Sequence, residues 1–136
     1  PAAQAKGMAL ELHVAEDFVV EWDRDKLTQL LVILIDNAIK YTLDSGDVHI
    51  TLADKLDKGV RYLTLEVRDN GMGIAPEALP RVFDRFYRQD KARTRQIGGH
   101  GLGLAIAKNL VDAAQGSIYA ESQLGVGSTF RVRIPV

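Results

Sequence analysis

One stretch of the chain carries an apolar stripe that repeats at three- and four-residue steps, and this stripe restricts the fold more than any other feature. The stripe consists of Leu27, Leu30, Leu31, Leu34, Ile35, Ala38 and Ile39. Its spacing puts these side chains on one side of an α-helix, which must bury them against a second layer of structure. Asp23 precedes the stripe and is a residue type that caps helices. We therefore predict a helix that begins after Asp23 and runs to about Tyr41.

Short runs of strand-forming residues lie on both sides of this helix. They are bounded by turn residues such as Ser45-Gly46-Asp47, Lys58-Gly59 and the glycine turn 124–128. We predict strands over Met8–Leu12, Phe18–Val20, Val48–Leu52, Tyr62–Val67, Ser117–Ser122 and Thr129–Ile134. We also expect a short helix from Pro76, a polar loop over Arg88–Gln96, and a helix from about Leu102 to Ala114 that Gly116 closes. Together these elements predict an α/β (α+β) fold in which helices back a sheet.

The composition limits the classes of function. With 136 residues, 46% hydrophobic and 26% charged, the chain has the balance of one domain with one core. A net charge of -1 favours neither nucleic acid nor a membrane surface as a partner. The absence of cysteine excludes disulfides, thiolate nucleophiles and cysteine-ligated metals, and suits a reducing cytosolic compartment. Residues 1–7 read as a linker remnant and residues 8–136 as the domain.

The segment Asp69-Asn70-Gly71-Met72-Gly73-Ile74 directly follows a strand of alternating apolar residues. A carboxylate held at a strand end is a fixed hydrogen-bond acceptor, and Gly71 and Gly73 let the backbone bend and let a flat ligand lie close to it. A purine with its exocyclic amine fits this arrangement. By itself the segment more often forms an ordinary turn, because Asp-Asn-Gly is a common turn signal.

Glycines at positions 98, 99, 101 and 103 precede the last helix. Backbone N–H groups and the positive end of the helix dipole converge at such a start, so phosphate oxygens can bind there. The segment has neither the Lys-Ser/Thr ending of a Walker loop nor a Gly-x-Gly-x-x-Gly fingerprint. A flexible hinge is the alternative, and the density of glycines favours ligand contact by roughly two to one.

A second stripe on the first long helix holds Ile33, Asn37, Lys40 and Tyr41. Asn37 offers a neutral oxygen to a hard cation and Lys40 a positive charge to phosphate, although each residue alone is common on solvated helix surfaces. Asp36 and Lys40 have the four-residue spacing of a surface ion pair.

The histidines His13, His49 and His100 have no metal-ligand spacing. We expect His49 to be a packing or surface residue of a strand, and His100 to be a polar spacer in the glycine segment. The chain contains no Gly-x-Ser-x-Gly elbow and no His-Glu-x-x-His helix, so hydrolase and metalloprotease functions have no support.

Five segments, taken in order, together resemble the catalytic ATP-binding domain of bacterial sensor histidine kinases. They are DNAIKYT at 36–42, DNGMGI at 69–74, VFDRFYR at 82–88, GHGLGLA at 99–105 and GVGSTF at 125–130. The resemblance extends from Leu10 to Pro135. It implies the Bergerat ATP-binding fold, a two-layer sandwich in which a mixed sheet of about five strands packs on three helices beside a mobile ATP lid.

The resemblance also implies ATP and Mg²⁺ as cofactors and a role for each matching residue. Asn37 would coordinate Mg²⁺, Lys40 would contact the phosphates, and Tyr41 would lie near the nucleotide. Asp69 would accept a hydrogen bond from the adenine amine. The base would be lined by Gly71, Gly73 and Ile74, with Thr129 beneath it.

The rest of the implied site belongs to the lid and the glycine segment. Tyr87 and Arg88 would cover the nucleotide, and the backbone of the glycine segment would cradle its phosphates, with contacts from Gly99, His100, Gly101, Leu102, Gly103 and Leu104. Asn37, Lys40 and Arg88 would be catalytic, because catalysis in such a kinase consists of positioning and neutralising the γ-phosphoryl group.

In this family the nucleophile is a histidine on a separate dimerising helical domain. His13 lacks the following acid and proline of a phosphoacceptor helix, so we expect the chain to be the catalytic half of a kinase. The resemblance implies a cytoplasmic domain, monomeric in isolation, of a parent protein anchored in the cell membrane. That parent would act on a response regulator. The alternatives are an anti-sigma serine kinase, which has a glutamate at the position of Ile33, and a regulator that binds ATP without transferring phosphate.

Ile33 departs from the commonest family pattern, which has a second asparagine at that position. Isoleucine cannot ligate Mg²⁺, so the metal shell would rely on Asn37, ATP oxygens and water. We predict that Ile33→Asn strengthens Mg²⁺-dependent nucleotide binding. A titration of Mg²⁺ against nucleotide binding that gives identical curves for variant and parent would refute this prediction.

Overall fold

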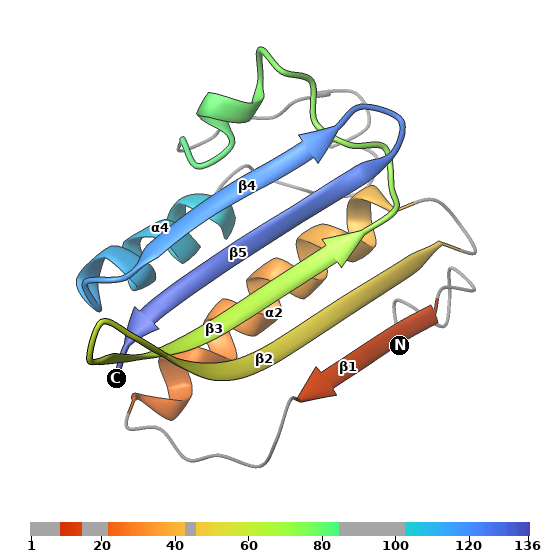
Figure 1. Ribbon diagram of the computed structural model, residues 1–136. Coiled ribbons are helices and arrows are strands. Elements are labelled where there is room, and N and C mark those ends of the chain that lie inside the picture. The colour runs from red at the N-terminus through yellow and green to blue at the C-terminus, as the bar shows by residue number, and fades with distance from the viewer. Residues whose placement is uncertain (1–8, 15–21, 43–45, 85–102) are drawn as a thin grey trace.

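A five-stranded sheet forms one layer of the molecule, with the strand order β1-β2-β3-β5-β4 (Figure 1). The computed structural model describes residues 9–14, 22–42, 46–84 and 103–136. The strands are β1 (Ala9–Val14), β2 (Asp47–Asp57), β3 (Val60–Asp69), β4 (Ser117–Gln123) and β5 (Gly127–Pro135). β1 pairs with β2 in parallel, and all other pairs are antiparallel. The predicted mixed sheet is therefore confirmed.

β2 and β3 are longer than the sequence predicted because they form one extended hairpin. Lys58 and Gly59 connect them, and both have positive φ angles of 51° and 81°. Two successive residues with positive φ make the turn that matches the twist of paired strands. The expected turn at these two residues is confirmed.

Two helices cover the same face of the sheet, α2 (Arg24–Tyr41) and α4 (Gly103–Ala113) (Figure 1). α2 begins as predicted, because Asp23 Oδ1 accepts hydrogen bonds from the N–H groups of Asp25 at 2.8 Å and Lys26 at 3.1 Å. The prediction for α2 is thus confirmed nearly to the residue, and the helix predicted from about Leu102 begins at Gly103 among the described residues.

The short helix expected from Pro76 is not an α-helix. The chain there forms a turn followed by the 3-10 helix η1 (Leu79–Arg81). Pro80 explains the difference, because it has no N–H to bond the carbonyl of residue 76, which an α-helix starting there would need. The predicted strand Phe18–Val20 and loop Arg88–Gln96 lie outside the described residues.

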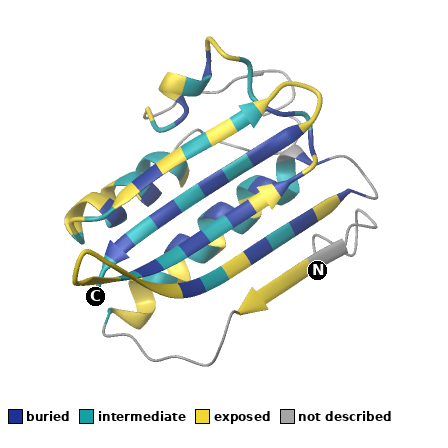
Figure 2. Ribbon diagram, viewed as in Figure 1, coloured by how far each residue is buried: buried dark blue, intermediate teal, exposed yellow. Residues whose placement is uncertain are grey.

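The core lies between the helices and the sheet. Leu30, Leu34 and Ala38 of α2 are almost fully buried, as the apolar stripe predicted. They pack against alternate residues of the strands, and Figure 2 shows this alternation of buried and more exposed positions along β3 and β5. The sheet consequently has a core face toward the helices and, on its other side, a polar face that we call the open face.

No helix among the described residues combines the length and apolar character needed to cross a membrane.

Candidate functional site

One end of the sandwich gathers the ends of both layers. α2 ends there at Tyr41 and β3 at Asp69, while α4 begins there at Gly103 and β5 at Gly127 (Figure 1). Three of the five sequence segments that carry the resemblance therefore meet at this end, together with the described part of the glycine segment. A ligand at this end can contact helix residues and strand ends at the same time.

Asp69 is the last residue of β3, and only 8% of it is exposed. Its Oδ1 accepts a hydrogen bond from the N–H of Gly71 at 2.9 Å, and the N–H of Ser128 also donates to the carboxyl. Burial outweighs these two bonds and raises the pKa of Asp69 above its ordinary value of 3.8. An ionised carboxyl has about four acceptor sites, so two donors leave this fixed group able to accept another hydrogen bond.

The burial of Asp69 should affect how the stability of the nucleotide-free chain depends on pH. A carboxyl whose pKa is raised by folding stabilises the fold at low pH and loses that contribution as pH rises through the folded pKa. We therefore predict that the melting temperature of Asp69→Asn minus that of the parent grows as pH rises from about 4 toward 7. Melting temperatures of both chains across this pH range test the prediction. A difference that does not grow with pH would contradict it.

The segment that follows Asp69 is fastened on both of its sides. Asn70 Oδ1 accepts a hydrogen bond from the N–H of Asp47 at 2.8 Å, and the N–H of Asn70 donates to the carbonyl of Asp47 at 3.3 Å. On the other side, the N–H of Ile74 donates to Ser122 Oγ at 2.6 Å. The segment is a turn held between β2 and the β4–β5 hairpin, which makes Asp69 part of a rigid framework.

Gly73 and Gly127 allow this close packing. Gly73 has a φ of 75°, and a Cβ there would overlap the carbonyl oxygen of Gln123 and lie 2.8 Å from Leu124 Cα. Gly127 has a φ of 149°, and a Cβ there would overlap the carbonyl oxygen of Asp69. The sequence interpretation gave Gly73 the task of leaving room for a ligand. The space beside its Cα is instead filled by the hairpin turn, so its first role is structural.

The register of β5 bears on the prediction for Thr129. Side chains alternate along β5, so residues 128 and 129 point to opposite faces. Ser128 pairs with Asp69, is 7% exposed, and its Oγ lies 3.0 Å from Ser122 Oγ. Thr129 pairs with Arg68 instead and lies on the open face. Ser128, not Thr129, is the hydroxyl residue beside Asp69.

Ser128 was missed although the sequence contains a signal for it. Phe130 is the aromatic residue of the GVGSTF segment and its side chain is buried in the core, where its ring makes an edge contact with Phe83 at 6.0 Å between centroids. Counting back by two from Phe130 reaches Ser128, which must share the core face. The role of Ser122, which also donates to the carbonyl of Gly127 at 2.9 Å, had no comparable signal.

The last two turns of α2 bring polar groups to the same end. Asn37 is half-buried, and Lys40 Nζ lies 3.0 Å from Asp36 Oδ2, which confirms the expected surface pair. Ile33 packs against the core, and a Cβ on Gly103 would lie 3.4 Å from Ile33 Cγ2. Ile33 therefore lies beside the start of α4, where a larger residue at position 103 would touch it.

The described residues contain only part of the predicted site. Leu104 follows Gly103 in α4 and is half-buried against the core. The side chain of Tyr41 lies outside the described residues, as do Tyr87, Arg88, Gly99, His100, Gly101 and Leu102. Their assignments stay predictions.

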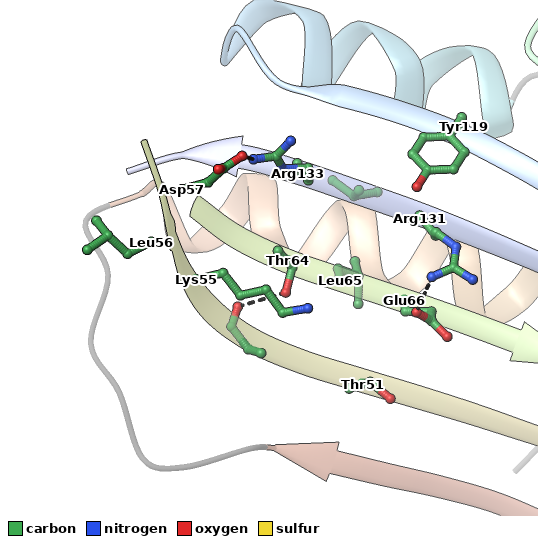
Figure 3. Close-up of a pocket in the computed structure, with 12 residues that line it drawn as sticks. Thr51, Lys55, Leu56, Asp57, Thr64, Leu65, Glu66, Tyr119, Arg131 and Arg133 are labelled. Atoms are coloured by element: carbon green, nitrogen blue, oxygen red, sulfur yellow. Dashed lines mark hydrogen bonds and ion pairs between the residues drawn. The ribbon is translucent and has the colours of Figure 1, made fainter. Parts of the chain in front are cut away.

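A cavity of about 440 Å³ lies elsewhere, on the open face (Figure 3). Its walls carry two ion pairs, Arg131 Nη1 to Glu66 Oε2 at 2.9 Å and Arg133 Nη2 to Asp57 Oδ2 at 3.0 Å. None of the predicted site residues lines it. Because no predicted site residue lines this cavity, we place the candidate site at the end of the sandwich that holds Asp69.

The chain is similar to known proteins in both sequence and fold. The sequence model of the family described as "Histidine kinase-, DNA gyrase B-, and HSP90-like ATPase" matches residues 22–136. Sensor histidine kinase WalK of Bacillus subtilis is 47% identical over 119 residues, which are 88% of this chain and 19% of that protein. Sensor protein SrrB of Staphylococcus aureus is 40% identical over 129 residues, 95% of this chain and 21% of that protein. The chain therefore spans about a fifth of the length of these relatives.

Solved structures show the same fold. The catalytic domain of histidine kinase ThkA, in a nucleotide-free form, superimposes with a TM-score of 0.80 at 27% identity, covering 98% of this chain and 83% of that chain. Full-length ShkA in complex with AMPPNP gives a TM-score of 0.80 at 30% identity, covering 99% of this chain and 27% of that chain. The two-layer sandwich of the described residues is thus a fold found in histidine kinase catalytic domains.

Proposed function

Because the chain belongs to the histidine kinase-, DNA gyrase B- and HSP90-like ATPase family, we propose that it binds ATP with Mg²⁺ and donates the γ-phosphoryl group to a histidine on a separate domain of a parent sensor kinase. The relatives that match most of this chain are sensor kinases, which supports this branch of the family. The observation that carries the proposal is the buried, doubly hydrogen-bonded carboxylate of Asp69 at the end of β3.

We assign recognition of the base to Asp69. Its fixed carboxylate would accept a hydrogen bond from the exocyclic amine of adenine, a charge-assisted bond that a ketone at the same position of a base cannot make. Ser128 pairs with it in the β3–β5 register, and the Ser128 hydroxyl shares a hydrogen bond of 3.0 Å with the hydroxyl of Ser122 on β4. Gly71 and Ile74 flank the acid on the same fastened turn. This arrangement supports adenine over guanine or hypoxanthine as the base.

We assign the phosphates and the metal to the end of α2 and the start of α4. The donor set suits Mg²⁺, because Asn37 carries a carboxamide oxygen and hard cations prefer oxygen ligands. When bound, Mg²⁺ would neutralise phosphate charge. Lys40 would exchange its partner Asp36 for a phosphate oxygen. Breaking this solvent-exposed ion pair costs at most about 1 kcal/mol. The N–H groups that open α4 at Gly103 would donate to phosphate oxygens.

The chemistry that these residues would assist is an in-line displacement. A histidine nitrogen of the phosphoacceptor domain would attack the γ-phosphorus, the bond from that phosphorus to the β,γ-bridging oxygen would break, and ADP would leave. The chain would contribute by holding ATP and screening its charge. The helical phosphoacceptor domain, the response regulator and membrane anchoring of the parent protein belong to this proposal as well.

Two other functions predict different products. An anti-sigma serine kinase would transfer phosphate to a serine, and a regulator would bind ATP without transfer. The serine kinase reading is weakened because Ile33 cannot act as the glutamate found there, and its side chain is packed against the core. The regulator reading rests on Ile33 alone, while Asn37, Lys40 and Asp69 are all present.

A single transfer assay distinguishes the three functions. The chain is incubated with γ-labelled ATP, Mg²⁺ and a dimerisation-phosphoacceptor domain from a sensor kinase that matches it. We expect a labelled adduct on the acceptor that is lost in acid and stable in base, as phosphohistidine is. An acid-stable adduct would indicate serine transfer, and binding of ATP without any adduct would favour the regulator. A matched acceptor whose histidine is replaced by glutamine is the control and should stay unlabelled.

A further inference from the structure

Two histidines and a glutamate meet at the edge of the sheet. Glu11 and His13 lie on β1, and His49 lies on β2. The parallel pairing puts Glu11 opposite His49 and His13 opposite Thr51. Alternation along each strand then turns all three side chains to the open face. The spacing in the sequence predicted no metal site for these histidines, because the contact depends on the pairing of two separate segments.

The donor atoms of this cluster are close together. Glu11 Oε2 lies 3.3 Å from His13 Nε2 and 3.2 Å from His49 Nδ1. The imidazole rings are stacked, with centroids 5.8 Å apart and planes at 11°. The three donor atoms all lie within 4.8 Å of one another. Ligands at about 2.1 Å from a tetrahedral Zn²⁺ are about 3.4 Å apart, so small rotations of these side chains suffice to surround an ion.

We propose that Glu11, His13 and His49 form a binding site for a transition-metal ion of the Zn²⁺ class. Imidazole nitrogens with one carboxylate oxygen are ligands that suit Zn²⁺, Cu²⁺ and Ni²⁺, whereas Mg²⁺ prefers oxygen alone. Three protein ligands leave a fourth position for water. Arg68 pairs with His49 in the β2–β3 register, but its side chain is exposed, so solvent screens its charge. This site is separate from the Mg²⁺ site proposed beside Asn37.

A bound ion would fasten the edge of the sheet. Residues 11–14 of β1 are all exposed, and Figure 2 shows this strand at the edge, beside β2. The backbone ladder to β2 is therefore its main attachment among the described residues. An ion held by β1 and β2 together would add a side-chain link, so metal binding should stabilise the folded chain.

The test is metal binding by the nucleotide-free chain. Isothermal titration with ZnCl₂ should give one ion per chain, and a hundredfold excess over the dissociation constant should raise the melting temperature by about 8 °C. Co²⁺ in place of Zn²⁺ should produce the visible absorption of a four-coordinate site. Glu11→Gln, His13→Gln and His49→Gln should each lose most of the thermal shift.

Two matched controls separate this cluster from general binding to acids and histidines. Asp54→Asn removes an exposed acid from the same strand as His49, and His100→Gln removes the remaining histidine. Both should keep the full Zn²⁺ shift. All three ligand side chains are at least partly exposed, so the ligand variants should melt like the parent without metal. No Zn²⁺ shift in the parent, or an equal shift in the three ligand variants, would overturn the proposal.

Discussion

Asp69→Asn is expected to weaken ATP binding by about 100-fold, because a hydrogen bond to a buried carboxylate is worth about 1.5–3 kcal/mol. The substitution preserves shape but replaces one acceptor oxygen with an NH₂ donor. The backbone N–H groups of Gly71 and Ser128 both donate to this side chain and so compete for the one remaining oxygen. In either orientation of the new carboxamide, its NH₂ group faces the adenine amine or a backbone N–H. Neither of these groups can accept a hydrogen bond from it. Isothermal titration with a non-hydrolysable ATP analogue measures the loss.

The same variant should reverse the choice of base. Inosine triphosphate has a ketone oxygen in place of the adenine amine, so the parent should bind it far less tightly than ATP. Asp69→Asn offers an N–H to that ketone and should bind inosine triphosphate at least as well as ATP. Glu66→Gln is the control, since it removes an acid from the same strand but on the open face, where Glu66 pairs with Arg131 at 2.9 Å. An Asp69→Asn chain that is folded and binds ATP like the parent would refute the assignment of Asp69.

Gly73→Ala is expected to destabilise the nucleotide-free chain by about 3 kcal/mol or more. A left-handed backbone costs a residue with a Cβ about 1–2 kcal/mol, and overpacking against atoms that cannot move adds about 1–3 kcal/mol. At Gly73 both terms apply, because φ is 75° and the obstructing atoms, the Gln123 carbonyl oxygen and Leu124 Cα, belong to the backbone. Thermal and urea unfolding measure the effect.

Gly125→Ala provides the matched control for this prediction. Gly125 has a similar φ of 80°, but nothing lies within 4 Å of a Cβ built there. The Gly125→Ala chain should lose only about 1 kcal/mol of unfolding free energy, the cost of the left-handed backbone alone. If Gly73→Ala cost no more than Gly125→Ala, Gly73 would not be needed for packing, and ligand approach would again be its main role.

The sequence predicted the fold well because its signals are local and periodic. The stripe from Leu27 to Ile39 can be recognised from the helix repeat alone. Asp23 can be recognised as the N-cap from its position before that stripe. The strands were found in the same way, and their ends were missed where the hairpin extends pairing beyond the apolar residues. The helix expected from Pro76 failed because Pro80 has no N–H for the hydrogen bond to the carbonyl of residue 76 that would continue it.

Only part of the candidate site could be predicted from the sequence. Asp69, Asn37 and Lys40 were singled out from residue type and order alone, and the fold brings the elements that carry them to one end of the sandwich. Which hydroxyl lies beside Asp69 required the register of β5 against β3, since a shift of one residue exchanges Ser128 for Thr129. The packing role of Gly73 could be recognised only from the structure, because it depends on the hairpin turn that packs against this residue.

The sequence by itself determined which secondary structures form and which residue types are available for nucleotide chemistry, because helix and strand periods and motif order are properties of neighbouring residues. Only the tertiary structure decided which distant residues touch. Glu11, His13 and His49 show this most clearly, since no spacing along the chain marks them as partners. They meet because β1 and β2, which are far apart in the sequence, pair in parallel in one register through their backbone hydrogen bonds.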